Sequence, residues 1–156
     1  PLSVTDEGMS RFWMSVGEAV QLVAWAARHG LRGGVIVPHL PAFLLTTLAT
    51  ALLADGQTWQ VSTRRPGEKL VECLMTPEEQ TRSYWYVHAE QLPALYVIPP
   101  VMQGWGAGDE RALWTTPPSE MMSGQPASSQ QFAYSSDTWP WQLDVHDVRQ
   151  RIRGMA

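Results

Sequence analysis

The sequence predicts a single α+β domain in which a mainly antiparallel sheet of about four to five strands packs against two N-terminal helices. The 156 residues suffice to bury one core, and 44% of them are hydrophobic while 17% are charged. In the first part of the chain, apolar residues recur with the period of a helix. Runs of β-branched and aromatic residues, separated by turn residues, follow it.

The first helix is predicted by its start signal. Ser15 and Glu18 have the spacing of a capping box, in which the hydroxyl and the carboxylate each accept a hydrogen bond from the other residue's amide. Apolar residues recur with a helical period up to Ala27, and Gly30 suits the left-handed position after a helix end.

Residues 33–54 carry no formally charged side chain, which raises the question of a membrane span. Pro38 and Pro41 interrupt the run, because proline lacks an amide donor and disfavours helical geometry in the preceding residue. A strand over 35–37 and a buried helix over 41–54 are therefore expected, and this helix is shorter than the roughly 20 residues that a bilayer requires. Its leucines are expected to be mostly buried: Leu44, Leu45, Leu48 and Leu52.

Four later runs have the composition of strands, namely 57–63, 69–75, 83–89 and 94–98. The first two flank a Pro-Gly turn at residues 66–67, so they are predicted to pair as a hairpin. One helical turn is expected after Thr76, where an N-cap residue precedes a proline and two acids.

Three regions follow from these elements. Residues 1–100 are expected to form the α+β core, and residues 143–156 a C-terminal helix whose acids come early and whose arginines come late. Between them, residues 101–142 form an extended segment rich in Pro, Gly and Ser, which packs on the core or on a partner.

The four tryptophans of this segment lead to the principal functional hypothesis. Large aromatic side chains dominate the energetics of many interfaces, and a freely disordered segment is normally poor in them. The predicted partner-binding residues are Trp105, Trp114, Trp139 and Trp141. We therefore expect a non-enzymatic protein-interaction or accessory module, bacterial and self-associating as a homodimer, with wrapping of these rings onto the same chain as the alternative.

A second hypothesis is a winged-helix-like nucleic-acid-binding protein. Arg64, Arg65 and Lys69 cluster at the predicted hairpin tip, where a wing would contact a phosphate backbone. The formal net charge of −4 gives no general attraction to nucleic acid, and the preceding helix has no basic face to read a groove. Nucleic acid is therefore the less favoured partner.

A third hypothesis is a small thiol hydrolase or transferase. Cys73 is the single cysteine, and His88 with Glu90 would have to activate it. The predicted strand instead places Cys73 on an apolar face, where a buried thiol behaves as a small hydrophobic residue. The histidines lack the spacing of metal ligands, so no metal and no cofactor is expected. Without a signal peptide or a membrane span, the expected location is cytoplasmic.

Overall fold

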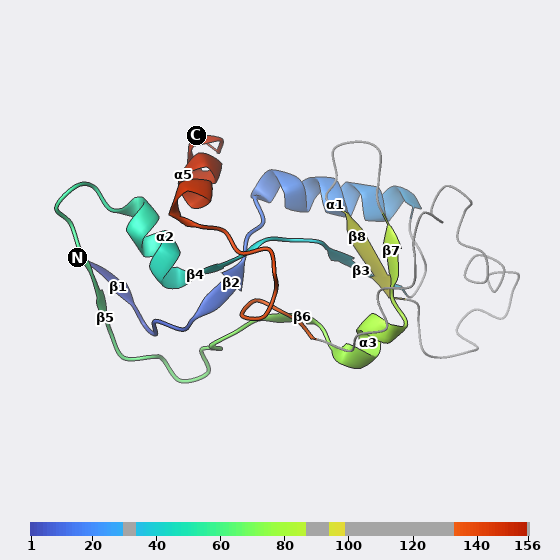
Figure 1. Ribbon diagram of the computed structural model, residues 1–156. Helices are drawn as coiled ribbons and strands as arrows, with labels where there is room; N and C mark the ends of the chain where they lie inside the picture. The colour runs from blue at the N-terminus through green and yellow to red at the C-terminus, as the bar shows by residue number, and fades with distance from the viewer. Residues whose placement is uncertain (30–33, 87–93, 99–132, 156) are drawn as a thin grey trace, which may run out of the picture. The chain divides into compact units, whose positions relative to one another are not determined.

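The computed structural model describes residues 1–29, 34–86, 94–98 and 133–155 as short helices joined to small sheets (Figure 1). This mixture confirms the predicted α+β class. Two compact units divide the chain. The first comprises Pro1–Ser15, Leu40–Leu74 and Tyr134–Ala156, and the second comprises Val16–His39 and Met75–Ala133.

The strands of the first unit pair two by two: β1 (Leu2–Val4) with β5 (Trp59–Val61), β2 (Ser10–Phe12) with β4 (Ala42–Leu44), and β6 (Cys73–Met75) with β9 (Tyr134–Ser135). β1 runs parallel to β5, beside which it lies in Figure 1, and β2 runs antiparallel to β4. Such short pairs are marginally stable alone. Side-chain packing around them must therefore hold this unit together.

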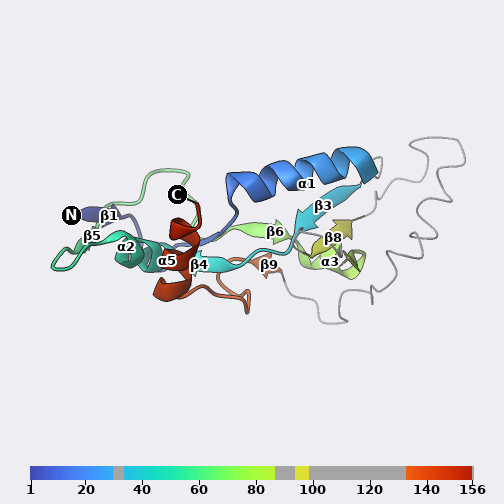
Figure 2. The ribbon, with the colours of Figure 1, turned by 90° about the horizontal axis from the view of Figure 1, so that it is seen from above.

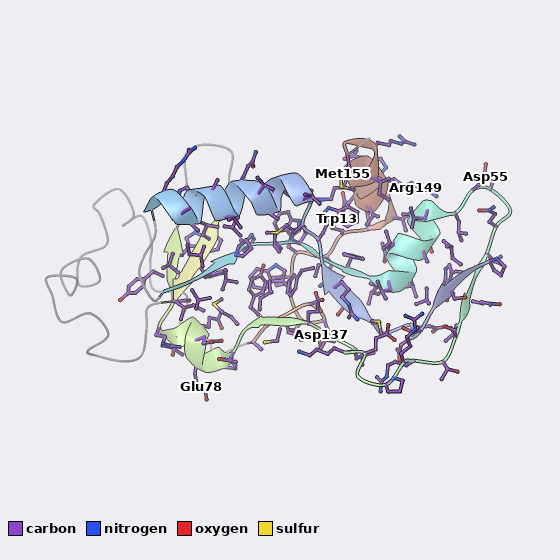
Figure 3. The ribbon with its side chains drawn as sticks, turned by 180° about the vertical axis from the view of Figure 1, so that it is seen from behind. Trp13, Asp55, Glu78, Asp137, Arg149 and Met155 are labelled. Carbon is purple, nitrogen blue, oxygen red and sulfur yellow. The ribbon has the colours of Figure 1, made fainter. Side chains whose placement is uncertain are left out.

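Two helices and the strand β4 form the apolar core of the first unit. α2 (Leu45–Leu52) packs against α5 (Val145–Arg153), and the fully buried Val148 of α5 belongs to the same cluster as Phe43 and Ala51. Arg149, labelled in Figure 3, donates a 3.3 Å hydrogen bond from Nε to the carbonyl oxygen of Ala51. That bond satisfies an acceptor in the last turn of α2, where cations are favourable.

Tyr134 ties the C-terminal part of the first unit to its middle. Its ring is completely buried, and its hydroxyl lies 2.6 Å from the amide nitrogen of Leu40 and 3.1 Å from that residue's carbonyl oxygen. The hydroxyl thus accepts one hydrogen bond and donates another. Phe12 meets the ring edge-on at 4.9 Å, and Trp139 lies 4.1 Å from it between ring centroids.

The second unit is built on a three-stranded antiparallel sheet in the order β3 (Val35–Pro38), β8 (Leu95–Ile98), β7 (Tyr84–Tyr86). All the residues of the central strand β8 are buried. α1 (Val16–His29) runs alongside β3 in Figures 1 and 2 and contributes the buried Trp25. The short α3 (Pro77–Thr81) follows a complete capping box between Thr76 and Glu79.

The predicted helix starts are confirmed where a local capping signal exists. α1 begins directly after Ser15, and α5 begins after Asp144, whose carboxylate accepts a 2.8 Å hydrogen bond from the Asp147 amide. The antiparallel pairing of the two predicted strands 83–89 and 94–98 is also present, as β7 and β8.

The predicted hairpin between 57–63 and 69–75 is wrong. A turn does form, because the Glu68 amide donates to the Arg65 carbonyl oxygen at 3.1 Å and Gly67 has a positive φ of 82°. The strands on either side nevertheless take other partners: β5 pairs with β1, and β6 pairs with β9. The strands of the described residues thus form four small sheets in place of the single larger sheet that we expected.

The helix predicted over 41–54 is shorter than expected, and its most buried residues are not the predicted leucines. Residues 42–44 form β4 because they pair with β2, so the helix begins only at Leu45. Leu44 and Leu52 are 41% and 53% exposed, which contradicts their predicted burial, whereas Ala49 and Ala51 are buried. Ala49 and Ala51 thus face the core of the first unit, and Leu45 and Leu48 pack against it partly buried, in partial agreement with the prediction. Within the described residues, no helix is long and apolar enough to cross a membrane.

The bonds of Tyr134 predict the effect of removing its hydroxyl. Tyr134→Phe should lower the free energy of unfolding by about 1–3 kcal/mol, because the Leu40 amide would stay buried without an acceptor. Thermal and urea unfolding measure this loss. Tyr84→Phe, at a ring that is 45% exposed, is the matched control and should change stability by at most about 0.5 kcal/mol. Equal effects of the two substitutions would contradict the role given to the Tyr134 hydroxyl.

Candidate functional site

The best-connected polar cluster of the described residues lies in the first unit, where β2, residues 69–72 and β9 come together. We call it the Arg11–Glu72 cluster, and it consists of Ser10, Arg11, Glu72 and Ser136. The Ser10 amide donates a 3.0 Å hydrogen bond to the Leu70 carbonyl oxygen, which holds residues 69–72 beside β2. Side chains far apart in the sequence thereby meet at one place.

The guanidinium of Arg11 is held in one orientation. It donates to the carbonyl oxygens of Ser10, Lys69 and Leu70, at 2.6, 2.8 and 3.3 Å respectively. Its Nε lies 3.6 Å from Oε1 of Glu72. The side chains of Arg11 and Glu72 are 22% and 41% exposed, so the charged groups are supported from within the protein and still reach solvent.

Two buried serines form the base of the cluster. Ser10 and Ser136 are completely buried, and their Oγ atoms lie 2.7 Å apart. Ser136 Oγ also accepts from the Glu72 amide at 2.9 Å, and its own amide donates to the Glu72 carbonyl oxygen at 2.9 Å. Oε2 of Glu72 accepts from the Phe12 amide at 3.1 Å. Both carboxylate oxygens are therefore engaged, one with a backbone amide and one with Arg11.

This geometry suits the binding of an anion. Three of the five N–H groups of the guanidinium donate to backbone carbonyl oxygens and Nε faces Glu72, so one N–H group of Nη2 stays available to a phosphate or carboxylate oxygen. The guanidinium also stays charged at all physiological pH values. Because the protein already fixes Arg11, a ligand would not have to order a free side chain. Glu72 acts as a positioning residue that keeps the guanidinium in place, and its charge lowers the net positive charge offered to an anion.

A second polar recess lies beside the C-terminal helix of the first unit. It has a volume of about 350 Å³ and is lined by Trp141, Leu143, Asp147, Gln150 and Arg151. The Arg151 guanidinium lies 5.9 Å above the Trp141 ring, a distance typical of a cation–π contact. One face of the indole is thus covered by a side chain of the same protein.

The second unit holds an aromatic group around His39. Its ring meets Trp85 edge-on at 5.0 Å, and the Tyr96 ring centroid lies 6.3 Å away. Burial lowers the pKa of His39 and raises the pKa of Tyr96, since both charged forms lose solvation. Both side chains are therefore neutral near pH 7, and this group offers apolar contact instead of charge.

The predicted partner-binding tryptophans have different environments. Trp139 is only 5% exposed, because it packs on Tyr134, whereas Trp141 is 40% exposed. Trp105 and Trp114 lie outside the described residues, as do His88 and Glu90 of the thiol hypothesis. The described part of the chain contains no group of three or more His, Cys, Asp or Glu side chains arranged to hold a metal ion.

The basic residues of the nucleic-acid hypothesis are exposed, but the expected wing is missing. Arg64, Arg65 and Lys69 lie between β5 and β6, which do not pair with each other. Lys69 contributes its backbone carbonyl oxygen to the Arg11–Glu72 cluster. The predicted winged-helix arrangement is therefore wrong, because β5 and β6 pair with other strands.

Cys73 is exposed, contrary to its predicted place on a buried strand face. The prediction assumed that the apolar neighbours Val71 and Met75 define one buried face across the whole run. Only Met75 is buried there, because the regular strand begins at Cys73 and pairs with the two-residue β9.

Comparison with known proteins identifies a matching family and several similar enzymes. The profile of a family described as "Polysaccharide biosynthesis protein" matches residues 1–92. The UDP-glucose 4-epimerase of Rickettsia felis is 34% identical over 102 residues, which cover 63% of this chain and 28% of the epimerase. The enzyme of the same name from Rickettsia typhi is 33% identical over 101 residues, with the same coverage. This chain thus matches only 28% of the length of these relatives.

A solved structure agrees with this result at the level of the fold. The X-ray structure of Pen from Bacillus thuringiensis superposes with a TM-score of 0.72 at 22% sequence identity. The match covers 99% of this chain and 40% of that chain. It shows that the chain shares its fold with part of a larger protein.

These comparisons correct the principal functional hypothesis. A non-enzymatic interaction or accessory module was expected from the tryptophans, whereas the matched family is described by a biosynthetic role and the similar proteins are named as enzymes. The accessory-module, nucleic-acid and thiol-enzyme hypotheses are therefore not retained.

The buried serine pair predicts coupled effects on stability. Ser136→Ala should cost about 1–3 kcal/mol, because it leaves Ser10 Oγ and the Glu72 amide buried without their partner. The double variant with Ser10→Ala should lose less than the sum of the single losses, by about 0.5–3 kcal/mol. Urea unfolding of the four proteins measures the coupling, with the exposed Ser3→Ala as control. Strict additivity would show that the two hydroxyls do not share a bond.

The exposure of Cys73 predicts its accessibility in the native protein. A thiol reagent such as DTNB should label the folded chain to one equivalent without denaturant, because this is the single cysteine. Release of the coloured thiolate measures the reaction, and Cys73→Ser should abolish it. Labelling that requires prior unfolding would contradict the exposed position.

Proposed function

This chain belongs to the polysaccharide biosynthesis protein family, and we propose that it forms part of an enzyme that modifies a nucleotide-linked sugar. Its role in that enzyme is to bind and orient the nucleotide sugar. The similarity to UDP-glucose 4-epimerases over 102 residues carries the proposal. It concerns binding, and it assigns no chemical step to a residue of this chain.

The chemistry of the relatives' named substrate defines what must be recognised. UDP-glucose joins a glucose to a uridine through a diphosphate, so a binding site must compensate negative charge at the phosphates. Arginine is well suited to this task, because it stays charged and its N–H groups donate to phosphate oxygens. The overall charge of −4 makes this protein unattractive to anions in general, so the compensation has to be local.

Arg11 is the residue that we propose for the diphosphate contact. It lies within residues 1–92, which match the family, and its bonds to backbone carbonyl oxygens fix its direction while leaving it partly exposed. A fixed cation binds with less loss of side-chain entropy than the exposed Arg64 and Arg65 would. Glu72 serves as the positioning residue, since it contacts Arg11 and the Phe12 amide at the same time.

Location and assembly stay predictions for this protein. The cytoplasmic location and the self-association expected from the sequence both fit an enzyme of sugar-nucleotide metabolism.

Titration calorimetry of the chain with UDP-glucose tests the proposal. Arg11→Gln should weaken binding about 10- to 100-fold, because a hydrogen bond to a charged group is worth about 1.5–3 kcal/mol. Arg11→Lys should bind with intermediate strength, since it keeps the charge and loses the contacts that fix the guanidinium. Circular dichroism and the melting temperature must show that each variant is folded, because Arg11 also holds residues 69–70.

Three controls give the result its meaning. Arg64→Gln removes an exposed arginine outside the cluster and should leave the affinity unchanged. UDP should compete with UDP-glucose while free glucose should not, and the affinity should fall with added salt. An affinity for UDP-glucose that is unchanged in a folded Arg11→Gln protein would refute the assignment of Arg11. A wild-type chain that binds no nucleotide sugar would refute the proposed role of the chain.

A further inference from the structure

The exposed indole of Trp141 stands on a stretch of backbone that is held in place. The amide of the completely buried Ala42 donates to the Trp141 carbonyl oxygen at 2.9 Å, and the Leu143 amide donates to the Ala42 carbonyl oxygen at 2.8 Å. Between these bonds, the side chain of Gln142 donates to the Trp139 carbonyl oxygen at 2.7 Å. The Trp141 side chain is nevertheless 40% exposed. A large aromatic ring is thus fixed at the surface of the first unit.

The polar side of α5 and this indole line one recess. Gln150 and Arg151 follow Asp147 by three and four positions, so the three side chains share one side of the helix. Val148 lies on another side and packs in the core. With Trp141, the three polar side chains line the recess of about 350 Å³ described above. Small-molecule sites have volumes of roughly 300–1,000 Å³, so this recess suits a ligand group the size of one ring.

The polar groups of the recess supply both acceptors and donors. Oδ2 of Asp147 accepts a 3.1 Å hydrogen bond from the Asp144 amide within the capping box, so the helix start fixes the direction of this carboxylate. Nε2 of Gln150 lies 2.8 Å from Nε2 of His146, which orients the amide group. The guanidinium of Arg151 lies 5.9 Å above the indole and adds further N–H donors. One carboxylate, one amide and one guanidinium therefore surround the ring, and their charges balance.

This combination of groups matches the chemistry of a sugar ring. A pyranose has faces of apolar C–H groups, which pack on an indole, and a rim of hydroxyl groups that each donate and accept. Carboxylate, amide and guanidinium groups are planar and can bond neighbouring hydroxyls in pairs. Because the charges of Asp147 and Arg151 balance, the recess favours an uncharged ligand over a phosphate.

We propose that Trp141, Asp147, Gln150 and Arg151 form a binding site for a neutral pyranose unit of an oligosaccharide. The sugar packs a C–H face on the indole and directs its hydroxyls toward α5. The site shares no residue with the Arg11–Glu72 cluster, and it lies outside the residues that match the family profile. A saccharide ligand also agrees with the description of that family as a polysaccharide biosynthesis protein.

Titration of the chain with cellotetraose tests this site. The ring hydroxyls of its glucose units are equatorial, so both faces of each ring are apolar. The wild-type chain should bind with a Kd on the order of 1 mM, because the contact is small. Trp141→Ala should weaken binding about 10-fold or more through the loss of the stacked ring. Chemical-shift changes of the amide and indole N–H groups in NMR spectra measure the affinity.

Two further variants separate binding from folding. Gln150→Ala changes an exposed side chain and should weaken binding about 2- to 10-fold, which corresponds to one neutral hydrogen bond. If Trp141→Ala does not fold, Gln150→Ala gives the decision. Tyr84→Ala is the matched control, since it removes a ring of similar exposure, 45%, outside the recess and should leave the affinity unchanged.

Competition distinguishes this site from the proposed nucleotide-sugar site. UDP should not displace cellotetraose, and added salt should leave the affinity for cellotetraose unchanged, because this ligand carries no charge. Displacement by UDP would show that the recess belongs to the nucleotide-sugar site and would overturn the inference. No binding by the wild type, or full affinity in a folded Trp141→Ala or Gln150→Ala protein, would overturn it as well. A chain that binds UDP-glucose and not cellotetraose would refute this site alone.

Discussion

The structure of the first unit depends on the two hydrogen bonds between the Tyr134 hydroxyl and the backbone of Leu40, residues that are 94 positions apart in the sequence. Because the ring is completely buried, its hydroxyl has to find both a donor and an acceptor inside the protein. This requirement fixes where the C-terminal stretch joins β4, and residues 141–143 then continue along Ala42 by backbone hydrogen bonds. Two positions after Tyr134, the same stretch delivers Ser136 to Ser10. The candidate site therefore exists only when the C-terminal stretch is in place.

The Arg11–Glu72 cluster combines a structural and a functional property. As an ion pair at a partly exposed position it adds little to stability, because solvent screens the two charges. Its value lies in the direction that it gives the guanidinium, which is held by carbonyl oxygens on one side and a carboxylate on another. Because the protein has a net charge of −4, an anionic ligand needs local compensation of its charge. The proposed contact with a sugar nucleotide rests on this arrangement.

The tryptophans show why a compositional signal led to the wrong functional hypothesis. Aromatic residues in a segment rich in proline and glycine are typical of interfaces, but they also complete cores whose regular elements are short. Trp139 belongs to the second class, since it packs on Tyr134. Exposed apolar side chains are found instead on α1, at Val16, Val20 and Val23. In the sequence, these valines follow the ordinary period of a buried helix face.

The sequence by itself determined the local elements. The helices α3 and α5 start at capping boxes, and β3 ends at Pro38, because these signals act between residues three or four positions apart. It did not determine which strands pair, because strands of two or three residues carry too little side-chain pattern to select a partner. Nor did it reveal the site: Arg11, Glu72 and Ser136 are distant in sequence, and none of them lies in a recognisable motif. Only the tertiary structure decided these features, since buried hydrogen-bonding groups must find partners wherever the folded chain brings them together.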